Sequence, residues 1–571
     1  MERYKWIYEE PTADELEKAG GLAVELDLSE PLALLLVKRG ITSAAEARRF
    51  FHPQLTELHN PFLMKDMDRA VERLNDAIGM KEKVLVFGDY DVDGCTAVAL
   101  VYKFLHQYYT NVDYYIPDRY DDGYGVSYNA IDRAAGIGVR LIIILDCGIK
   151  AVDEIAYAKQ KGIDFIVCDH HMPDPELPAA YAVLDPKRKD ETYPYGDLCG
   201  CGIGFKFMQA FAMSNGFEFS KLIPLLELCA ISIAADIVPI MGENRILAYH
   251  GLKRLNVAPS VALQAIIRVC GLDGKEISMN DISYRIAPRI NASGRIREGR
   301  ETIDLLIEKD FDKALEKAKT INIYNEARKE IDKHVTDEAN RIARSIENLE
   351  DLRSIVVYSE QWHKGVIGIV ASRLVELYYR PTVVLAIDGD VATGSARSVA
   401  GFDVYSAVES CRDLLDSFGG HTYAVGFTLH RANIDSFRDR FEKYVENNIL
   451  PYQTVATVNI DVEVFFHDLN AKFHRDLKKF APFGPENPKP CFYTRHVYDY
   501  GTSKIVGRRQ EHIKLELVDN KSSNIMSGIA FGQSSYARVI KTKHPFDICY
   551  YIEDNSHKHG ALQLQIIDIH A

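Results

Sequence analysis

Five short apolar runs alternate with stretches of helical pattern between residues 84 and 186, and this alternation limits the possible folds more than any other feature. Strands separated by helices of this length are typical of α/β proteins with a doubly wound, mostly parallel sheet. Helices are expected at Ala97–Gln107, Asn129–Ala135 and Ala151–Lys161. The runs themselves are VLVFG (84–88), VDYYI (112–116), RLIIILD (140–146), DFIVCD (164–169) and AVLDP (182–186).

Acidic residues stand where these runs end. Asp89 follows the first run, Asp146 ends the third and Asp169 ends the fourth, while Asp236 follows a further apolar run, LCAISIAA. Because ligands of such sheets bind beyond the carboxyl ends of the strands, we expect a functional site there. A single carboxylate at a strand end is often a helix N-cap, but four of them with a neighbouring histidine pair indicate more than capping.

The segment DYDVDG, residues 89–94, allows two other interpretations. An EF-hand calcium loop needs a glutamate at its twelfth position between two helices, but that position is Leu100 and a strand is expected before the segment. A phosphatase of the haloacid-dehalogenase type has a D-x-D-G sequence directly after a strand, but here Gly88, Asp89 and Tyr90 precede Asp91. A metal cluster is favoured over both.

Crowded carboxylates repel one another unless cations lie among them. Oxygen ligands with one or two imidazoles suit Mg²⁺ or Mn²⁺, whereas a zinc site would use cysteine or more histidines. Two such ions can activate water and stabilise both the attacking and the leaving oxygen of a phosphoryl displacement. The sequence therefore predicts a two-metal site for phosphoryl transfer.

Composition sets wider limits. A chain of 571 residues is expected to form several domains, and 47% hydrophobic with 26% charged residues is typical of a soluble protein. The net charge of −14 disfavours a protein that coats nucleic acid, but it does not exclude an enzyme that acts on it.

Ten cysteines without a C-x-x-C pair indicate reduced thiols, and the N-terminus lacks a signal-peptide pattern, so a cytoplasmic location is expected. The apolar stretch Leu222–Met241 contains two prolines and two acidic residues, so no membrane span is expected.

Changes of pattern along the chain predict five parts. Residues 300–347 lack proline, are rich in charge and have helical periodicity, which predicts a linker of one helix or a helix pair. A second α/β unit follows, with strands at RSIVVYS (353–359) and TVVLAI (382–387) and a helix at Val366–Tyr379. Short β-rich segments from about residue 452 predict a small OB-like barrel. The predicted parts are a helical segment 1–60, a metal domain 61–300, a linker 301–347, a second α/β domain 348–450 and a barrel 451–571.

Together, GDYDVDG, LDCG, CDHH and AADIVP resemble the four motifs of the DHH phosphoesterase superfamily. The resemblance extends from about residue 60 to the C-terminus and narrows to the RecJ branch, whose second α/β domain is of the DHHA1 type. It implies an exonuclease specific for single-stranded DNA that degrades from the 5′ end, releases mononucleotides, requires Mn²⁺ or Mg²⁺ and acts in DNA repair and recombination. The matches to this branch are IPDRYDDGYGVS (116–127), APRINASGR (287–295), GSARS (394–398), FGGH (418–421) and FAPFGPENPKP (480–490).

The resemblance also implies residue roles. His171 would lie beside the scissile phosphate and act in catalysis with Asp146 and His170. Many relatives have a metal-binding histidine four residues before the middle aspartate, but this chain has Phe87 there, so Asp89 is expected to replace it. The ligands of two ions would be Asp89, Asp91, Asp93, Asp146, His170 and Asp236.

Two further groups of residues are candidates for substrate binding. A loop around Gly294 offers cations and neutral donors that suit phosphate oxygens, although an ordinary surface loop is the alternative. In the second α/β domain, glycines near a cation would let backbone N–H groups face an anion, and the resemblance implies that this domain closes over the metal domain. The candidates are Arg289, Asn291, Ser293 and Arg295 in the first group, and Ser395, Arg397, Ser398, Gly419, Gly420 and His421 in the second, with Arg119 and Tyr124 near the second strand.

Two other functions remain open at this point. One is a DHH phosphodiesterase for short oligonucleotides or cyclic dinucleotides, and the other is a non-catalytic DNA-binding scaffold, which would be expected to have lost metal ligands. By resemblance, the partners would be single-stranded DNA, a single-strand-binding protein and a repair helicase, and the protein would be a monomer. The cysteines of LCGCGIG are expected to be buried filler, and residues 200–204 are expected to form a glycine-rich turn before a helix at Phe205–Ala212.

Overall fold

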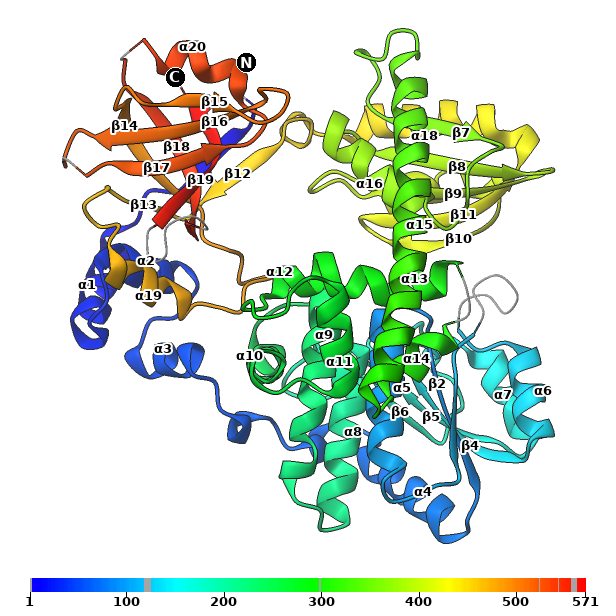
Figure 1. Cartoon of the computed structure of the whole chain (residues 1–571). Helices are drawn as coiled ribbons and strands as arrows, with labels where there is room; N and C mark the ends of the chain where they lie inside the picture. Colours follow the sequence, from blue (N-terminus) through cyan, green and yellow to red (C-terminus); the bar gives the residue numbers. More distant parts are fainter. Residues whose placement is uncertain are drawn as a thin grey trace.

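The computed structural model describes residues 3–117, 125–296, 299–522, 524–542, 544–555 and 562–570, with the backbone alone at Ser293, Arg295 and Ile296. Figure 1 shows three bodies: an α/β body that carries the acidic motifs, a second α/β domain at the far end of a long helix, and a barrel packed with N-terminal helices. No helix in the described ranges combines the length and the apolar character needed to cross a lipid bilayer.

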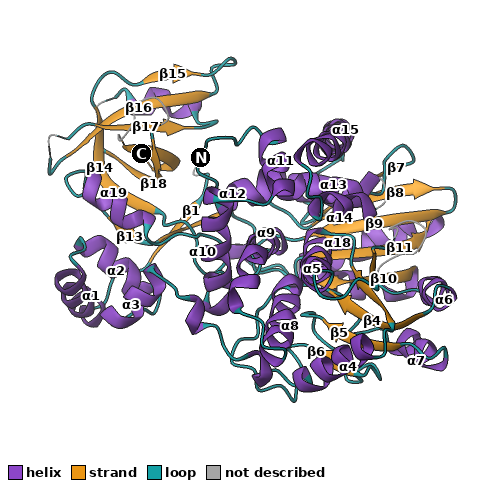
Figure 2. Ribbon diagram, turned by 60° about the horizontal axis from the view of Figure 1, so that its bottom comes forward, coloured by secondary structure: helices purple, strands orange, loops and turns teal. Residues whose placement is uncertain are grey.

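The first body is built on a five-stranded parallel sheet, as predicted. Its order is β3-β2-β4-β5-β6, and the strands are β2 (Lys83–Gly88), β3 (Val112–Tyr115), β4 (Val139–Leu145), β5 (Asp164–Cys168) and β6 (Ala182–Leu184). Alternate residues of β2 enter different cores, because Val84 and Val86 pack on one face and Leu85 and Phe87 on the other. Helices cover both faces (Figure 2): α4 (Met67–Gly79), α5 (Val92–Leu105) and α8 (Gly200–Ser214) on one, and α6 (Tyr128–Gly136) and α7 (Val152–Gln160) on the other.

Helices complete this body and connect it to the next domain. The completing helices are α9 (Leu226–Asp236), α10 (Gly242–Val257), α11 (Val261–Val269), α12 (Met279–Asp281), the π-helix η5 (Ile282–Ile286), α13 (Ala287–Ile296) and α14 (Arg300–Leu306). The single helix α15 (Phe311–Arg344) has 34 residues and is capped by Asp310, whose side chain accepts from the Lys313 N–H at 3.0 Å. At about 1.5 Å per residue it is roughly 50 Å long, and it carries the second domain at its far end.

The second α/β domain has a mixed five-stranded sheet of order β10-β11-β9-β8-β7. Only β7 and β8 are parallel; the other neighbours are antiparallel. The strands are β7 (Ile355–Ser359), β8 (Thr382–Asp388), β9 (Val391–Arg397), β10 (Leu415–His421) and β11 (Ala424–His430), and the helices are α16 (Ile367–Tyr378), α17 (Val404–Glu409) and α18 (Ile434–Asn448).

The C-terminal part is a closed five-stranded barrel, which confirms the OB-like expectation. The strands β14-β18-β19-β17-β16 are neighbours in this order, and pairing of β14 with β16 closes the ring. Two short strands, β13 (Val462–Glu463) and β15 (Lys504–Val506), flank it, with the helices α19 (Ala471–Lys478) and α20 (Ala537–Ile540). The barrel strands are β14 (Phe492–Asp499), β16 (His512–Asp519), β17 (Met526–Ala530), β18 (Phe546–Asp554) and β19 (Leu562–His570).

The N-terminal residues belong to the barrel in space. Strand β1 (Lys5–Tyr8) pairs in parallel with β12 (Thr457–Ile460), the strand that leads into the barrel. Leu32, Leu35 and Leu36 share one hydrophobic core with barrel residues such as Leu515 and Ile548. The segment predicted as helical therefore also contains a strand, and it shares a core with the C-terminal domain; its helices are α1 (Ala13–Leu26), α2 (Glu30–Lys38) and α3 (Ala44–Phe51).

A buried arginine joins this barrel body to the first α/β body. Arg245 of α10 is 4% exposed, and its guanidinium carbon lies 3.7 Å from the ring centre of Phe50. Its N–H groups donate to four carbonyl oxygens, those of Phe50 (2.9 Å), Phe480 (3.2 Å), Ala481 (2.9 Å) and Pro482 (3.3 Å). One side chain thus ties α10 both to the end of α3 and to the segment before the barrel.

Candidate metal centre

The turn from β2 into α5 brings three aspartates to the carboxyl edge of the sheet. Asp91 is the N-cap of α5, and its carboxylate accepts from the Gly94 N–H at 3.0 Å. A Cβ on Gly94 would lie 2.4 Å from the carbonyl oxygen of Asp89, so only glycine allows this close turn. The helix begins at Val92, earlier than the expected start at Ala97.

Asp146 and Asp236 approach the same place from different elements. Asp146 follows β4 and has φ 61°, in the left-handed region that non-glycine residues rarely occupy. Asp236 is the last residue of α9, so the expectation of a strand end there is wrong. A short apolar run such as LCAISIAA fits a buried helix as well as a strand, and periodicity cannot separate the two.

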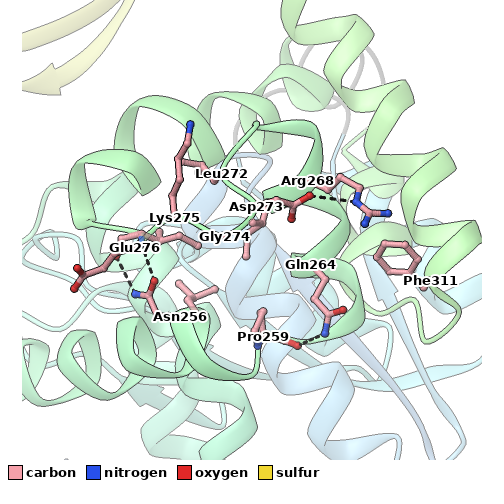
Figure 3. A pocket seen from close by; sticks show the side chains of 13 residues that line it. Asn256, Pro259, Gln264, Arg268, Leu272, Asp273, Gly274, Lys275, Glu276 and Phe311 are labelled. Carbon is pink, nitrogen blue, oxygen red and sulfur yellow. Dashed lines mark hydrogen bonds and ion pairs between the residues drawn. The ribbon is translucent and has the colours of Figure 1, made fainter. Parts of the chain in front are cut away.

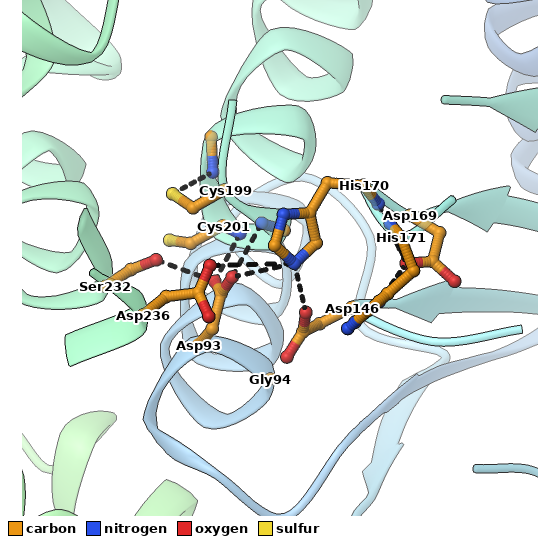
Figure 4. A network of polar contacts seen from close by, with 12 residues as sticks. Asp93, Gly94, Asp146, Asp169, His170, His171, Cys199, Cys201, Ser232 and Asp236 are labelled. Atoms are coloured by element: carbon orange, nitrogen blue, oxygen red, sulfur yellow. Dashed lines mark hydrogen bonds and ion pairs between the residues drawn. The ribbon is translucent and has the colours of Figure 1, made fainter. Parts of the chain in front are cut away.

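His170 lies at the centre of the cluster (Figure 4). Its Nε2 is 3.1 Å from Asp146 Oδ1, 3.7 Å from Asp236 Oδ2 and 3.8 Å from Asp93 Oδ2. The six predicted metal ligands and His171 fall into overlapping groups, and within each group the ligand atoms lie within 4.8 Å of one another: Asp89, Asp91 and Asp146; Asp93, His170 and Asp236; and Asp146, His170 and His171. Because Asp146 belongs to two groups, the geometry fits two neighbouring ions that share a carboxylate.

The electrostatics of the cluster also fit cations. Burial and the charges of neighbouring aspartates raise the pKa of Asp91 and Asp146, and they raise the pKa of Asp236 to about 8. Burial lowers the pKa of His170 to about 4, which keeps its imidazole neutral and able to bind a metal. Hard carboxylate oxygens with a neutral imidazole are a donor set for Mn²⁺ or Mg²⁺.

A helix N-terminus and a serine hold Asp93 in place. Its carboxylate accepts from the Gly200 and Cys201 N–H groups, both at 2.7 Å, and from Ser232 Oγ at 2.6 Å. A Cβ on Gly200 would lie 2.7 Å from Asp146 Cβ. The expected turn at 200–204 is therefore wrong: these residues begin α8, and the glycine lets this helix touch the metal cluster. The sequence reasoning missed Ser232 and the role of Gly200, although a glycine-rich helix start was visible.

A hydrogen bond to Asp169 fixes the orientation of the His171 ring. Asp169 Oδ1 lies 2.7 Å from His171 Nδ1, and Asp169 Oδ2 accepts from the Ile149 N–H at 2.9 Å. Burial alone would lower the pKa of His171, but the hydrogen bond and the charge of Asp169 outweigh it and raise this pKa. Lys187, after β6, lies near enough for its charge to lower the pKa of His170. This lysine was missed, although it follows a strand that ends at the same edge.

The second domain presents a half-buried cation at a cavity of about 590 Å³. Arg397, at the end of β9, donates to Ser395 Oγ at 2.9 Å and to the Ala396 carbonyl at 2.8 Å. A Cβ on Gly368 would lie 2.8 Å from Arg397 Nη2, so the glycine allows α16 to approach it. Burial lowers the pKa of Arg397, and within the described ranges no carboxylate forms an ion pair with it. This arrangement suits an anion.

The other residues predicted with Arg397 lie on neighbouring strands of the same sheet: Gly419 and His421 of β10 pair with Gly426 and Ala424 of β11, which pair with Ser395 and Arg397 of β9. Gly419 lines the Arg397 cavity, whereas the His421 ring centre lies 6.3 Å from that of His171. Gly420 is needed for strand packing, because a Cβ there would lie 2.2 Å from the Ala424 carbonyl oxygen. Ser398 Oγ donates to the Phe402 carbonyl within a turn. The glycines lie in β10, the edge strand of the sheet, which pairs on one side with β11.

The first substrate group forms helix α13, so the expectation of a loop there is wrong. Arg289 donates to Asn322 Oδ1 of α15 at 2.8 Å and to the Arg285 carbonyl at 2.6 Å, which uses its guanidinium inside the protein. Gly294 packs on the Tyr90 carbonyl, where a Cβ would be at 2.6 Å, so α13 does lie against the metal loop. The side chains of Ser293 and Arg295, and all of Arg119 and Tyr124, fall outside the described structure.

A polar groove of about 600 Å³ lies between α10, α11 and the start of α15 (Figure 3). Its polar side chains bond to the protein itself: Arg268 pairs with Asp273 at 3.2 Å, and Asn256 donates to the Ile277 carbonyl at 2.9 Å. None of the metal-cluster residues lines it. The groove is therefore not part of the candidate metal centre.

Three family models match separate parts of the chain. The model described as DHH family, N-terminal domain, matches residues 83–233 and contains most of the metal cluster. The DHHA1 domain model matches residues 351–447, which include Arg397 and His421. The RecJ OB domain model matches residues 460–568.

Similar curated proteins extend this result over the whole chain. The single-stranded-DNA-specific exonuclease RecJ of Salmonella typhimurium is 31% identical over 561 residues, which are 95% of this chain and 95% of that protein. RecJ of Bacillus subtilis is 36% identical over 529 residues, 92% of this chain but 65% of that protein, so the chain spans about two thirds of that relative.

Solved structures agree on the fold. RecJ from Thermus thermophilus in complex with Mn²⁺ superposes with a TM-score of 0.85 at 24% identity, covering 100% of this chain and 80% of that one. An exonuclease RecJ bound to manganese has a TM-score of 0.60 at 29% identity, covering 71% of this chain and 99% of that one. With the acidic cluster and the three domain matches, these findings show that the chain belongs to the RecJ family within the DHH phosphoesterases.

Proposed function

We propose that this protein is an exonuclease that hydrolyses the phosphodiester bonds of single-stranded DNA from the 5′ end and releases mononucleotides. The observation that carries the proposal is the overlapping carboxylate cluster around His170, which faces a second domain with a half-buried cation, Arg397, that has no carboxylate partner among the described residues. Membership of the RecJ family supports the substrate and the polarity.

Six residues would hold two Mn²⁺ or Mg²⁺ ions. When bound, such ions would supply a water of lowered pKa and stabilise charge on the phosphate oxygens. Asp89 would supply the ligand that Phe87, a buried ring of β2, cannot supply. The proposed ligands are Asp89, Asp91, Asp93, Asp146, His170 and Asp236.

The remaining groups would position the strand. His171 uses Nδ1 toward Asp169, which leaves Nε2 to donate to a phosphate oxygen of the substrate. Its raised pKa favours the protonated form, which suits an anionic phosphate. Arg397, already fixed by Ser395 and a backbone carbonyl, would hold a further phosphate with little loss of side-chain freedom. The distance between His171 and Arg397 would set which phosphodiester bond of the strand is cut.

A phosphodiesterase for short oligonucleotides or cyclic dinucleotides is the second candidate function. The closed barrel argues against this second function, because a dinucleotide held between the metal cluster and Arg397 would need no contact with the barrel. A non-catalytic scaffold is disfavoured because every predicted metal ligand is present and lies in the cluster.

We further propose that the protein acts in the cytoplasm as a monomer, in DNA repair and recombination, with a single-strand-binding protein and a repair helicase as partners. Family membership supports this cellular context.

Digestion of labelled substrates tests the proposal. Single strands labelled at the 5′ or the 3′ end, duplexes and dinucleotides are incubated with Mn²⁺ or with EDTA. We expect Mn²⁺-dependent release of mononucleotides from the 5′ end of single strands, and its loss in Asp146→Ala and His170→Ala. Preference for a dinucleotide over a long strand would favour the second function, and activity that survives both substitutions would disprove the metal assignment.

A further inference from the structure

A cavity of about 300 Å³ lies next to the metal cluster. Its walls come from the end of α9, from α12 to α13, and from the segment that leads to the barrel. Ile237 in its wall directly follows Asp236 in the chain. Whatever occupies this cavity therefore lies beside the reacting centre.

The lining residues have a distinctive chemistry: none of them is charged. Apolar groups such as Pro288, Phe483 and Pro485 are combined with the side-chain amides of Asn280 and Asn291. The absence of cations makes this cavity less suited to a phosphate than to an uncharged group. It suits a flat, uncharged group with hydrogen-bonding edges, and a nucleobase has these properties.

Ile237 is held in an unfavourable conformation. Its φ of 61° and ψ of 33° lie in the left-handed region, which is a genuine outlier for a β-branched residue. Its side chain is also 70% exposed. Strain of this kind persists where function requires it, and an apolar side chain fixed at the cavity mouth indicates a ligand surface.

Tyr284 supplies a second exposed apolar group to the same cavity. It is 79% exposed and lies in the π-helix η5, a helix type that is rare and frequent at functional sites. Its ring stacks on no other ring in the described part of the chain. An exposed tyrosine without an aromatic neighbour can stack on a base of any sequence.

We propose that this cavity receives one unstacked base of the DNA strand, on the 3′ side of the cleaved phosphate, with Tyr284 and Ile237 as its contact surface. The 3′ side is assigned by taking Arg397, in the second α/β domain, to hold the phosphate at the 5′ end, so that the rest of the strand passes the cavity, whose residues 483–485 lead into the barrel. The inference rests on the proposed function, since the strand must run from Arg397 past the metal cluster toward the barrel. It assigns Tyr284 a role in substrate positioning.

Fluorescence of 2-aminopurine tests the inference without cleavage. Single strands of about 12 nucleotides, each with 2-aminopurine at one position near the 5′ end, are titrated with the full-length protein in EDTA. We expect strong quenching at one position, because stacking on tyrosine quenches this base. Tyr284→Ala should abolish the quenching at that position, Tyr284→Phe should retain it, and the control Tyr128→Ala, an exposed tyrosine of α6, should leave it unchanged.

Strands with a single abasic nucleotide give an independent measurement. For the parent protein, an abasic nucleotide at the quenched position should weaken strand binding about 5- to 100-fold, and Tyr284→Ala should remove this position dependence. A position dependence that persists unchanged in Tyr284→Ala would overturn the inference, as would the absence of position-specific quenching in the parent. Failure of the proposed function would appear separately, as a parent protein that binds but does not cleave single strands with Mn²⁺.

Discussion

His171 and His421 lie face to face although they belong to different domains: their ring centres are 6.3 Å apart and their planes are inclined by 11°. Burial and the charge of His171 lower the pKa of His421. The pKa of His421 is thus shifted down, whereas the hydrogen bond and the charge of Asp169 shift the pKa of the facing His171 up. The second α/β domain thus reaches the reacting centre itself.

We expect substitution of these two histidines to separate catalysis from binding. His171→Ala should lower kcat by roughly 10²- to 10⁴-fold, because the group that donates to the phosphate is lost, without changing Mn²⁺ affinity by a similar factor. His421→Ala should mainly raise KM. Single-turnover and steady-state kinetics on a 5′-phosphorylated strand measure this, with His430→Ala, in β11, as the control. Equal loss of kcat in both variants would contradict the division of roles.

Metal binding should release protons and become tighter as pH rises. In the metal-free protein, Asp236 has its pKa raised from 3.8 to about 8, so its contribution to stability is lost progressively as pH rises from about 4 to 8. Mn²⁺ replaces the proton, and the rise in Tm caused by Mn²⁺ should be larger at about pH 8 than at about pH 6. Thermal unfolding with Mn²⁺ or EDTA checks this, and calorimetry in two buffers counts the protons. A pH-independent rise in Tm would contradict it.

Gly200→Ala should damage the metal centre from outside the ligand set. The new Cβ would lie 2.7 Å from Asp146 Cβ and 2.9 Å from its Oδ1, so α8 or Asp146 must shift. We expect Mn²⁺ affinity to fall by about 10- to 100-fold, which is the usual effect of disturbing groups that orient ligands. Gly21→Ala, in α1 with no atom within 4 Å of the new Cβ, is the control and should raise stability by up to about 1 kcal/mol. Wild-type Mn²⁺ affinity in Gly200→Ala would show that the close approach of Gly200 to Asp146 does not affect metal binding.

Arg397→Ala should weaken strand binding more than metal binding. The guanidinium lies in the second domain, hydrogen-bonded to Ser395, and is not among the metal-ligating groups. Strand affinity, measured in EDTA by fluorescence anisotropy, should fall by about tenfold or more, in line with one lost charge-assisted contact. Arg373→Ala, which removes the pairing of Arg373 with Asp332 on α15, is the control. Parallel losses of strand and Mn²⁺ affinity would refute this assignment.

Arg245→Met should loosen the barrel body from the catalytic body. Four carbonyl oxygens lose their donor, which should cost on the order of 3 kcal/mol of stability. Small-angle scattering should show a larger radius of gyration, while cleavage of a dinucleotide changes less than cleavage of a long strand. Arg254→Met, on the same helix but paired with Glu227 inside the catalytic body, is the control. An unchanged scattering profile would contradict the role of Arg245 in holding the two bodies together.

The sequence predicted the parallel sheet and the acidic edge because both follow from local rules. Apolar runs of strand length ending in aspartate specify β2, β4 and β5, and parallel strands place Asp89, Asp146 and Asp169 at one edge without further information. The closed barrel was predictable for a similar reason, from several short strands at close spacing.

What the sequence could not show depends on contacts between distant residues. The helix that ends at Asp236 resembles a strand when read alone, since it is buried on all sides. Gly200 resembles a turn residue until the approach of Asp146 is known. His421 of β10 and Arg397 of β9 both pair with Ala424 of β11, so they lie at the same level of the sheet with one strand between them, which sequence spacing could not show.

The pairing of β1 with β12 also bears on biosynthesis. Lys5–Tyr8 are synthesised long before their partner strand, which begins only at Thr457. The apolar α2, whose leucines are buried against the barrel, must stay exposed while the catalytic body and the second domain are made. The core that the N-terminal helices share with the barrel therefore forms only after the barrel residues are made, and exposure of the α2 leucines makes this segment prone to aggregation until then.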